Sequence, residues 1–279
     1  MTGHTIEMQD SRLARFRQLV HTQTGIKMPA AKRPMIESRL RRRLIELHLT
    51  TLDDYLRYIF DGGHLTAELP HIIDQMTTNK TDFFREDSHY RLLRQVMIPA
   101  ALQQSAASFM FWSAAASTGA EAWSAAMELA EAARLDPRLE WRILGTDITE
   151  RVIALARTAV YSTTELAPIP APLRSAYVMA GKGPEGHLRG RIVPELRKHV
   201  SFHNLNLMVQ PFRIAGNMDV VFLRNVLIYF EPDLQARVIA ACADKIRPGG
   251  YFVVGHSESM VVQHPDLTPI APGAYRKRK

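Results

Sequence analysis

Apolar residues in the first 76 positions recur at the three- and four-residue spacing of amphipathic helices. Gly25 is a suitable stop for the first helix. The spacing predicts four short helices packed into an all-helical domain over residues 1–77, with apolar stripes formed by Leu13, Phe16, Leu19 and Val20, by Ile36, Leu40, Leu44 and Leu47, by Leu52, Tyr55, Leu56, Ile59 and Phe60, and by Leu69, Ile72, Ile73 and Met76.

Residues 78–106 lack a strong period at first and then become helical. The polar stretch that ends at Glu86 carries the hydrogen-bonding side chains of Asn79, Thr81 and Arg85. A plain linker is one interpretation, but this density of donors also fits a lid over a binding site. A helical pattern follows, and Pro99 is expected to kink or end it.

From residue 107 to 279, strand patterns alternate with helical patterns. Strands are expected from 109 to about 114 and over 141–147, 200–206, 218–225 and 251–254, with helices from about 119, over 149–157 and over 233–246. This alternation predicts an α/β fold with a mostly parallel, doubly wound sheet of the Rossmann type, covered on both faces. Residues 161–198 break the alternation with many Gly and Pro residues, which indicates a small antiparallel β insertion.

Candidate ligand-binding groups fall where the predicted strands end. Small residues over 114–119 leave the backbone bare before a helix, and Thr118 with Glu121 has the spacing of a capping box. Neither a G-x-G-x-x-G nor a Gly-Lys-Ser/Thr motif is present. Asp147 is placed to accept both hydroxyls of a ribose, although capping the next helix is an alternative role. Strand ends at Asn206 and at Arg224-Asn225 complete the expected crevice.

Charge and composition limit the expected location of the protein and the classes of partner it can bind. The 279 residues carry a net charge of +7, with one cysteine, Cys242, and no apolar run near the 20 residues or so that cross a bilayer. We therefore expect a cytoplasmic protein without membrane insertion. Arg39 and Arg42 point away from the apolar stripe of their helix and Arg43 lies at its margin, so they form either a solvated face or a docking surface. His256 and Glu258 lack further ligands at useful spacing, and no metal site is expected.

Several motifs together resemble CheR-type chemotaxis receptor methyltransferases. They are TNKTDFFRE (78–86), WSAAASTGAEAWS (112–124), LNL (205–207), RNVLIYF (224–230) and GHSES (255–259). The resemblance implies a class I S-adenosylmethionine-dependent methyltransferase. Its expected activity is methyl esterification of glutamate side chains on the cytoplasmic helices of chemoreceptors, which sets sensory adaptation and releases S-adenosylhomocysteine. It also implies recruitment of the enzyme to membrane receptor arrays.

The resemblance assigns roles to individual residues. The expected catalytic residues are Arg85 and Tyr229, with the tyrosine near the transferred methyl group. One departure is GAEAWS (119–124) where the family commonly has GEEPYS, but Glu121 is kept. The expected cofactor contacts are Asn79, Thr81, Arg85, Glu121, Asp147, Asn206, Leu207, Arg224 and Asn225.

Two protein contacts are also expected. Arg39, Arg42 and Arg43 would dock on an acidic receptor helix. In the family, the insertion can capture an acidic and aromatic peptide at the receptor C-terminus, and Arg189 and Arg191, with Lys182, suit such a peptide.

The chain is expected to be a monomer. Two rival functions remain open. A nucleic-acid methyltransferase would suit the basic charge, and Asn225-Val-Leu-Ile-Tyr229 loosely resembles an Asn-Pro-Pro-Tyr turn. It lacks both prolines and is one residue too long, so no nucleic-acid partner is expected. The other rival is a pure interaction protein. The full set of cofactor positions argues against this alternative.

Overall fold

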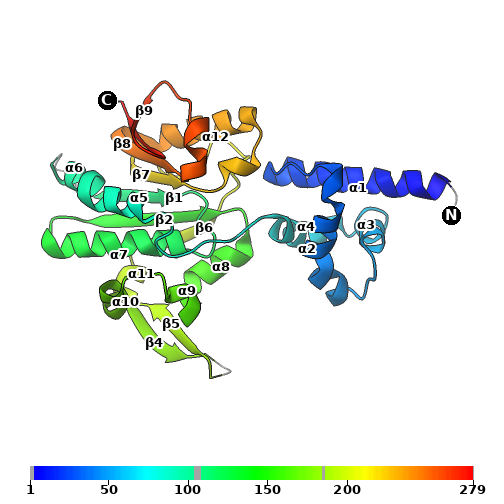
Figure 1. The fold of residues 1–279 in the computed structure, drawn as a ribbon, viewed down its shortest axis with the longest axis horizontal. Helices are drawn as coiled ribbons and strands as arrows, with labels where there is room; N and C mark the ends of the chain where they lie inside the picture. Colours follow the sequence, from blue (N-terminus) through cyan, green and yellow to red (C-terminus); the bar gives the residue numbers. More distant parts are fainter. Residues whose placement is uncertain (1–2, 104–107, 184–185, 279) are drawn as a thin grey trace. The chain divides into compact units, whose positions relative to one another are not determined.

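The computed structural model describes residues 3–103, 108–183 and 186–278, with side chains from residue 11 onward. It forms two compact units (Figure 1). One unit contains Met1–Thr78 and Tyr229–Leu234, and the other contains Asn79–Ile228 and Gln235–Lys279. The domain boundary expected at 106/107 falls outside the described residues. No described helix is long and apolar enough to cross a membrane.

The first unit confirms the expected helical domain. Its core buries most of the predicted stripes, with Phe16, Ile36, Leu40, Tyr55 and Leu56 at 0% exposure, whereas Leu69 and Ile73 of the fourth stripe are only half-buried. Gly25, with φ of 74°, follows the first helix, as expected for a residue that ends a helix in the left-handed region. The elements are α1 (Gly3–Thr24), the 3₁₀ turn η1 (Ala30–Lys32), α2 (Arg33–Glu46), α3 (Leu52–Phe60) and α4 (Leu65–Met76).

A buried carboxylate ties three of these helices together. Glu68 of α4 accepts hydrogen bonds from Arg43 Nη2 at 2.6 Å and Arg43 Nε at 2.9 Å, and from the Tyr55 hydroxyl at 3.0 Å. Burial by itself raises the pKa of Glu68, but the hydrogen bonds from Arg43 and Tyr55 outweigh it and the pKa is lowered. Arg43 therefore carries a structural role inside the helical unit.

The second unit is built on a seven-stranded sheet in the order β6-β2-β1-β7-β8-β10-β9. Strands β6, β2, β1, β7 and β8 run parallel, and β10 pairs antiparallel with both β8 and β9. This confirms the mostly parallel sheet. The strands are β1 (Phe109–Ser113), β2 (Trp141–Asp147), β6 (Val200–Asn204), β7 (Met218–Leu223), β8 (Ile246–Val254), β9 (Leu267–Ala271) and β10 (Ala274–Lys277).

The hairpin β9–β10 was not predicted. Most of β9 is exposed, so its sequence lacks the apolar signal of a buried strand. The central strands show the opposite pattern. Every residue of β7 is buried, which requires cover on both faces of the sheet. Helices α7 (Ala120–Leu135) and α8 (Glu150–Thr158) lie along the sheet in Figure 1, and α12 (Pro232–Lys245) precedes β8.

The helix that contains Pro99 neither ends nor breaks before it. Asp87–Leu92 forms α5, Leu93–Met97 forms a π-helical turn (η2), and Ile98–Gln103 continues as α6. Proline lacks an N–H and its ring would clash with the carbonyl four residues earlier in a regular α-helix. A wider turn just before Pro99 relieves both problems, so the helical path is kept.

The insertion forms a separate three-stranded antiparallel sheet in the order β3-β5-β4. This confirms the predicted small antiparallel insertion. Gly190 of β5 is buried, and a Cβ there would lie 2.5 Å from a Val178 side-chain carbon and 2.6 Å from a Leu166 side-chain carbon. The elements are β3 (Val160–Ser162), α9 (Thr163–Leu166), α10 (Ala171–Tyr177), β4 (Val178–Lys182), β5 (Leu188–Ile192) and α11 (Pro194–Arg197).

Candidate functional site

The loop after β1 is shaped by its backbone. Ser117 has φ of 50° and Gly119 has φ of 91°, both in the left-handed region. The Ala116 N–H donates to the Thr146 carbonyl at 2.8 Å, and the Ser117 N–H donates to Asp147 Oδ2 at 2.9 Å. A Cβ on Gly119 would lie only 2.9 Å from the Ala156 Cβ, so glycine is required there for packing as well as for φ. The loop therefore lies directly over the end of β2.

The prediction of a capping box formed by Thr118 and Glu121 is wrong. Helix α7 begins at Ala120 with Gly119 as its N-cap, and no side chain caps it. Glu121 instead accepts a hydrogen bond from Ser113 Oγ at 2.7 Å and pairs with Arg224 Nη1 at 3.1 Å. A buried carboxylate gains more from a guanidinium than from one backbone amide, and the tertiary fold brings that guanidinium within reach.

Asp147 is the last residue of β2 and lies shortly before α8, which begins at Glu150. Besides accepting from Ser117, its Oδ1 accepts from the Thr149 N–H at 3.1 Å, and Thr149 is the N-cap of α8. Its backbone carbonyl accepts from the Leu205 N–H at 2.9 Å, which brings the segment containing Asn206 alongside. Asp147 therefore holds the residue that precedes α8 but does not cap the helix, because the N-cap is Thr149 and no side chain makes a cap hydrogen bond. Binding of ribose by the Asp147 carboxylate remains a prediction.

Arg224, just beyond β7, is the buried centre of the site. Its side chain is 2% exposed and lies between Glu121 and Glu86, whose Oε2 is 3.2 Å from Arg224 Nη2. The same nitrogen donates to the carbonyl of Arg85. Arg224 Nε is buried without a hydrogen-bond partner among the described residues. The sequence placed Arg224 and Glu121 in the site, but it did not single out Glu86, which directly follows Arg85 in the TNKTDFFRE motif.

These charges do not cancel. One guanidinium faces two carboxylates, so the cluster of Glu86, Glu121 and Arg224 carries a net negative charge when both acids are ionised. Burial raises the pKa of Glu121, against the opposing pull of Arg224 and Ser113. A ligand group with positive charge would lower this cost, and Arg224 Nε remains available to an acceptor.

Glu258 organises the turn that follows Arg224. It is 0% exposed and accepts hydrogen bonds from the backbone N–H groups of Asn225 at 2.7 Å, Gly255 at 2.8 Å and Ile228 at 3.3 Å. Asn225 adopts φ of 59°, and its side-chain amide donates to Glu86 Oε1 at 3.4 Å. From the sequence, Glu258 was expected only as a possible half of a metal pair. Its positioning role was not predicted, because its partners are backbone groups.

The remaining expected site residues lie on three segments. The Asn79 carbonyl accepts from Ser117 Oγ at 2.7 Å, and Thr81 and Arg85 are half-buried in the same segment. Asn206 Oδ1 accepts from the Met208 N–H at 2.9 Å, and Leu207 beside it is buried. Tyr229 ends the 3₁₀ turn η3 (Leu227–Tyr229) and belongs to the compact unit that contains the helical domain.

The three expected docking arginines differ in their surroundings. Arg39 donates to the carbonyls of Met76 at 2.6 Å and Thr77 at 3.2 Å, which caps the C-terminus of α4. Arg43 is held by Glu68, as described above. Arg42 is 85% exposed and pairs with Glu46 at 3.0 Å on the same helix. Of the three, Arg42 presents the most accessible charge.

The expected peptide-binding arginines lie on the middle strand of the insertion. Arg189 and Arg191 are exposed on β5, and Arg191 Nε donates to the Thr158 carbonyl at 3.1 Å. Lys182 ends β4, which pairs with β5 on one side. The outer edge of β4 is an edge of the described sheet.

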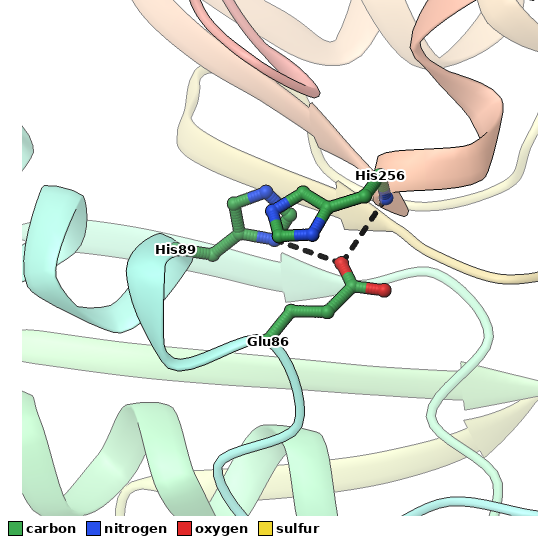
Figure 2. Close-up of side chains that lie close together, drawn as sticks. All are labelled: Glu86, His89 and His256. Atoms are coloured by element: carbon green, nitrogen blue, oxygen red, sulfur yellow. Dashed lines mark hydrogen bonds and ion pairs between the residues drawn. The ribbon is translucent and has the colours of Figure 1, made fainter.

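His256 has different neighbours from those expected. Glu258 turns to backbone groups, whereas Glu86 and His89 lie beside His256 (Figure 2). The backbone N–H of His256 donates to Glu86 Oε2 at 3.2 Å. Burial, followed by the charge of Arg224, lowers the pKa of His89 to about 4, so its imidazole is neutral near pH 7.

Comparison with known proteins covers nearly the whole chain. Residues 11–77 match the family described as "CheR methyltransferase, all-alpha domain", and residues 79–275 match "CheR methyltransferase, SAM binding domain". The chain is 37% identical to chemotaxis protein methyltransferase 2 of Pseudomonas aeruginosa, over 88% of this chain and 85% of that protein. It is 35% identical to the chemotaxis protein methyltransferase of Escherichia coli, over 91% and 86% respectively.

Proposed function

The chain belongs to the CheR methyltransferase family, and from this premise we propose that it methylates chemoreceptors in chemotaxis with S-adenosylmethionine as cofactor. The proposed acceptors are glutamate side chains, which become methyl esters while S-adenosylhomocysteine is released. The observation that carries the proposal is the buried cluster of Glu86, Glu121 and Arg224 at the carboxyl end of β7, with Asp147 at the carboxyl end of β2 on the other side of β1.

The residues present suit this cofactor. Bound S-adenosylmethionine supplies a methyl group on a positively charged sulfonium centre. Glu121 and Glu86 provide negative charge for its cationic groups, and Arg224 Nε provides a donor for its carboxylate. Asp147, at the end of β2, is proposed to accept hydrogen bonds from the ribose hydroxyls. Asn79, Thr81, Asn206, Leu207 and Asn225 complete the proposed binding set.

The protein has little proton chemistry to perform. A glutamate carboxylate is already an anion, so it needs no strong general base to attack an electrophilic methyl group. Holding two reactants in attack geometry can contribute up to about 7–11 kcal/mol, and we assign most of the rate to this effect. Arg85 and the hydroxyl of Tyr229 are proposed to orient the incoming carboxylate. A tight ion pair with Arg85 would favour the bound substrate over the less charged transition state, so placement is its main role.

The helical unit is proposed to dock on an acidic receptor helix through α2. Arg42 is the best-supported contact because its guanidinium is 85% exposed and its partner Glu46 is on the same helix. Exposed ion pairs of this kind contribute little to stability and are readily exchanged for a partner's carboxylate. Arg39 and Arg43 are engaged within the unit, so their contribution is to hold α2 against α4.

The insertion is proposed to bind an acidic peptide at the receptor C-terminus. The outer edge of β4 offers backbone groups for an added strand, and Arg189, Arg191 and Lys182 supply positive charge. Such tethering would raise the local concentration of enzyme near its targets and recruit a cytoplasmic monomer to membrane receptor arrays.

Two assays test the core proposal. S-adenosylmethionine should bind the purified chain in a calorimetric titration, and label from its methyl group should transfer to receptor glutamates in a base-labile form, as expected of an ester. Absence of cofactor binding would favour a pure interaction protein. Transfer to DNA or RNA in place of receptor would favour the nucleic-acid rival.

A separate titration tests the insertion. An acidic, aromatic peptide should bind with micromolar affinity, and the double variant Arg189→Glu with Arg191→Glu should abolish that binding while S-adenosylmethionine affinity stays the same. If the peptide does not bind at millimolar concentration while receptor methylation is intact, the insertion has another role.

A further inference from the structure

Three potential metal ligands meet at the end of β8. Glu86 directly precedes α5, His89 lies within α5, and His256 begins the 3₁₀ turn η4 (His256–Val261) that follows β8. One ligand atom from each residue lies within 4.8 Å of the other two. Figure 2 shows the two imidazole rings and the carboxylate turned toward one another.

His89 is arranged as metal-binding histidines usually are. Its side chain is 0% exposed, and Nδ1 lies 3.4 Å from Glu86 Oε2 with no hydrogen-bond partner in the described part of the chain. Its Nε2 lies 3.3 Å from the Pro272 carbonyl oxygen. That carbonyl can only accept, so the ring proton is assigned to Nε2 and the lone pair of Nδ1 faces the cluster. Histidine ligands commonly donate their second N–H to a backbone carbonyl in this way.

His256 gives the cluster access to solvent. It is exposed and lines a hollow of about 470 Å³ together with Ser88, Gln95 and Pro272. Its Nε2 lies 3.1 Å from Ser88 Oγ, a neutral and readily replaced partner. An ion could therefore enter from this side and keep a coordination position open to water.

We propose that Glu86, His89 and His256 bind a divalent transition-metal ion of the zinc type. Two imidazoles and one carboxylate form a ligand set used by zinc sites that keep an open position. Two ligands about 2.1 Å from one ion can be no more than roughly 4.2 Å apart. The widest pair must close by less than about 1 Å, and the exposed His256 ring can make that movement.

Arg224 limits the affinity of this site. Its Nη2 lies 3.2 Å from the same Glu86 oxygen that faces His89, so an ion and the guanidinium share one carboxylate. Repulsion between the two cations weakens binding relative to a structural zinc site. Micromolar binding is therefore expected, with a single ion per chain.

The test is a zinc titration of the full chain, carrying no affinity tag and freed of metal by a chelator. Calorimetry should show one site, and Co²⁺ should produce the visible absorption bands of a bound, low-symmetry ion. His256→Ala should weaken zinc binding at least tenfold and abolish the Co²⁺ bands. His203→Ala, which removes an exposed histidine of β6, serves as the matched control and should leave both signals intact.

The choice of His256 keeps the experiment decisive because this exposed residue can be removed without opening the core. The thermal unfolding midpoint of His256→Ala should match that of the wild type. The proposal is overturned if the wild-type chain shows no one-to-one binding below millimolar zinc. It is equally overturned if His256→Ala binds zinc as tightly as the wild type.

Discussion

Arg224 Nη1 lies 3.1 Å from Glu121 Oε2, so two residues from distant parts of the sequence form a buried ion pair at the centre of the site. Glu121→Ala should reduce the free energy of unfolding by about 1–3 kcal/mol, because it removes the acceptor of Arg224 Nη1 and of the buried Ser113 hydroxyl, while Glu86 still balances the charge of the guanidinium. Urea unfolding would measure this change. Glu121→Gln keeps the shape and a hydrogen-bond acceptor, so it should cost clearly less. Equal stability of Glu121→Ala and wild type would show that this pair is not needed for the fold.

Asp147 connects the loop after β1 with the start of α8, and its carboxylate is the proposed ribose acceptor. Asp147→Ala should raise the dissociation constant of S-adenosylmethionine by at least about tenfold, since hydrogen bonds to a charged group are each worth about 1.5–3 kcal/mol. Calorimetric titration would measure it. Glu150→Ala, which removes a neighbouring acid from α8, is a suitable control. Unchanged affinity in Asp147→Ala would remove Asp147 from the cofactor site.

Tyr229 is proposed to act on the acceptor and not on the cofactor. Tyr229→Phe removes only the hydroxyl, so it should lower kcat for receptor methylation about 10- to 100-fold while the dissociation constant of S-adenosylmethionine stays within a factor of two. Steady-state kinetics and a binding titration on the same preparation would separate the two quantities. Loss of cofactor binding with unchanged turnover per bound cofactor would mean that the role is misassigned.

The docking proposal distinguishes arginines that lie on one helix. Arg42→Glu should raise KM for receptor, as high salt does, and leave S-adenosylmethionine affinity and stability unchanged within about 0.5 kcal/mol. Arg41→Glu makes the same change in net charge at a neighbouring exposed position and shows how much of the effect is specific. Arg39→Glu should instead lower the thermal midpoint, because it removes the cap of α4. Wild-type kinetics in Arg42→Glu would leave α2 as a solvated face.

The helical unit should lose stability in acid through Glu68. Its pKa in the folded state lies below the ordinary value of 4.5, so the stabilising contribution is present above that value and is lost as pH falls through the lowered pKa. Amide hydrogen exchange of α3 and α4, corrected for intrinsic rates, should therefore accelerate between about pH 5 and pH 3. Glu68→Gln should be less stable at neutral pH and show a smaller change across this window. An identical pH response in both proteins would exclude Glu68 as the titrating group.

Local patterns predicted most elements of this fold because they depend on neighbouring residues. Periodic apolar stripes located the four helices of the first unit, and the strand and helix alternation predicted the parallel sheet and the insertion. Elements with weak local sequence signals were not predicted. The hairpin β9–β10 is largely exposed on β9, and the π turn before Pro99 depends on how the whole helix packs.

Periodicity and short motifs are read along the chain, so they were enough to predict the class of fold, the family and the strand ends at which binding groups gather. Which groups face each other depends on how the folded chain packs. In the folded protein, Glu121 pairs with Arg224 and does not cap a helix, and Glu258 accepts hydrogen bonds from three backbone amides. Arg43 pairs with Glu68, and Glu86 and His89 lie beside His256. Apart from the contact of Glu258 with the nearby Gly255 amide, each of these pairings joins residues that are distant in sequence. Burial makes the choice of partner energetically decisive, since a buried charge needs an opposite charge or several donors, and no local pattern specifies which one will be near.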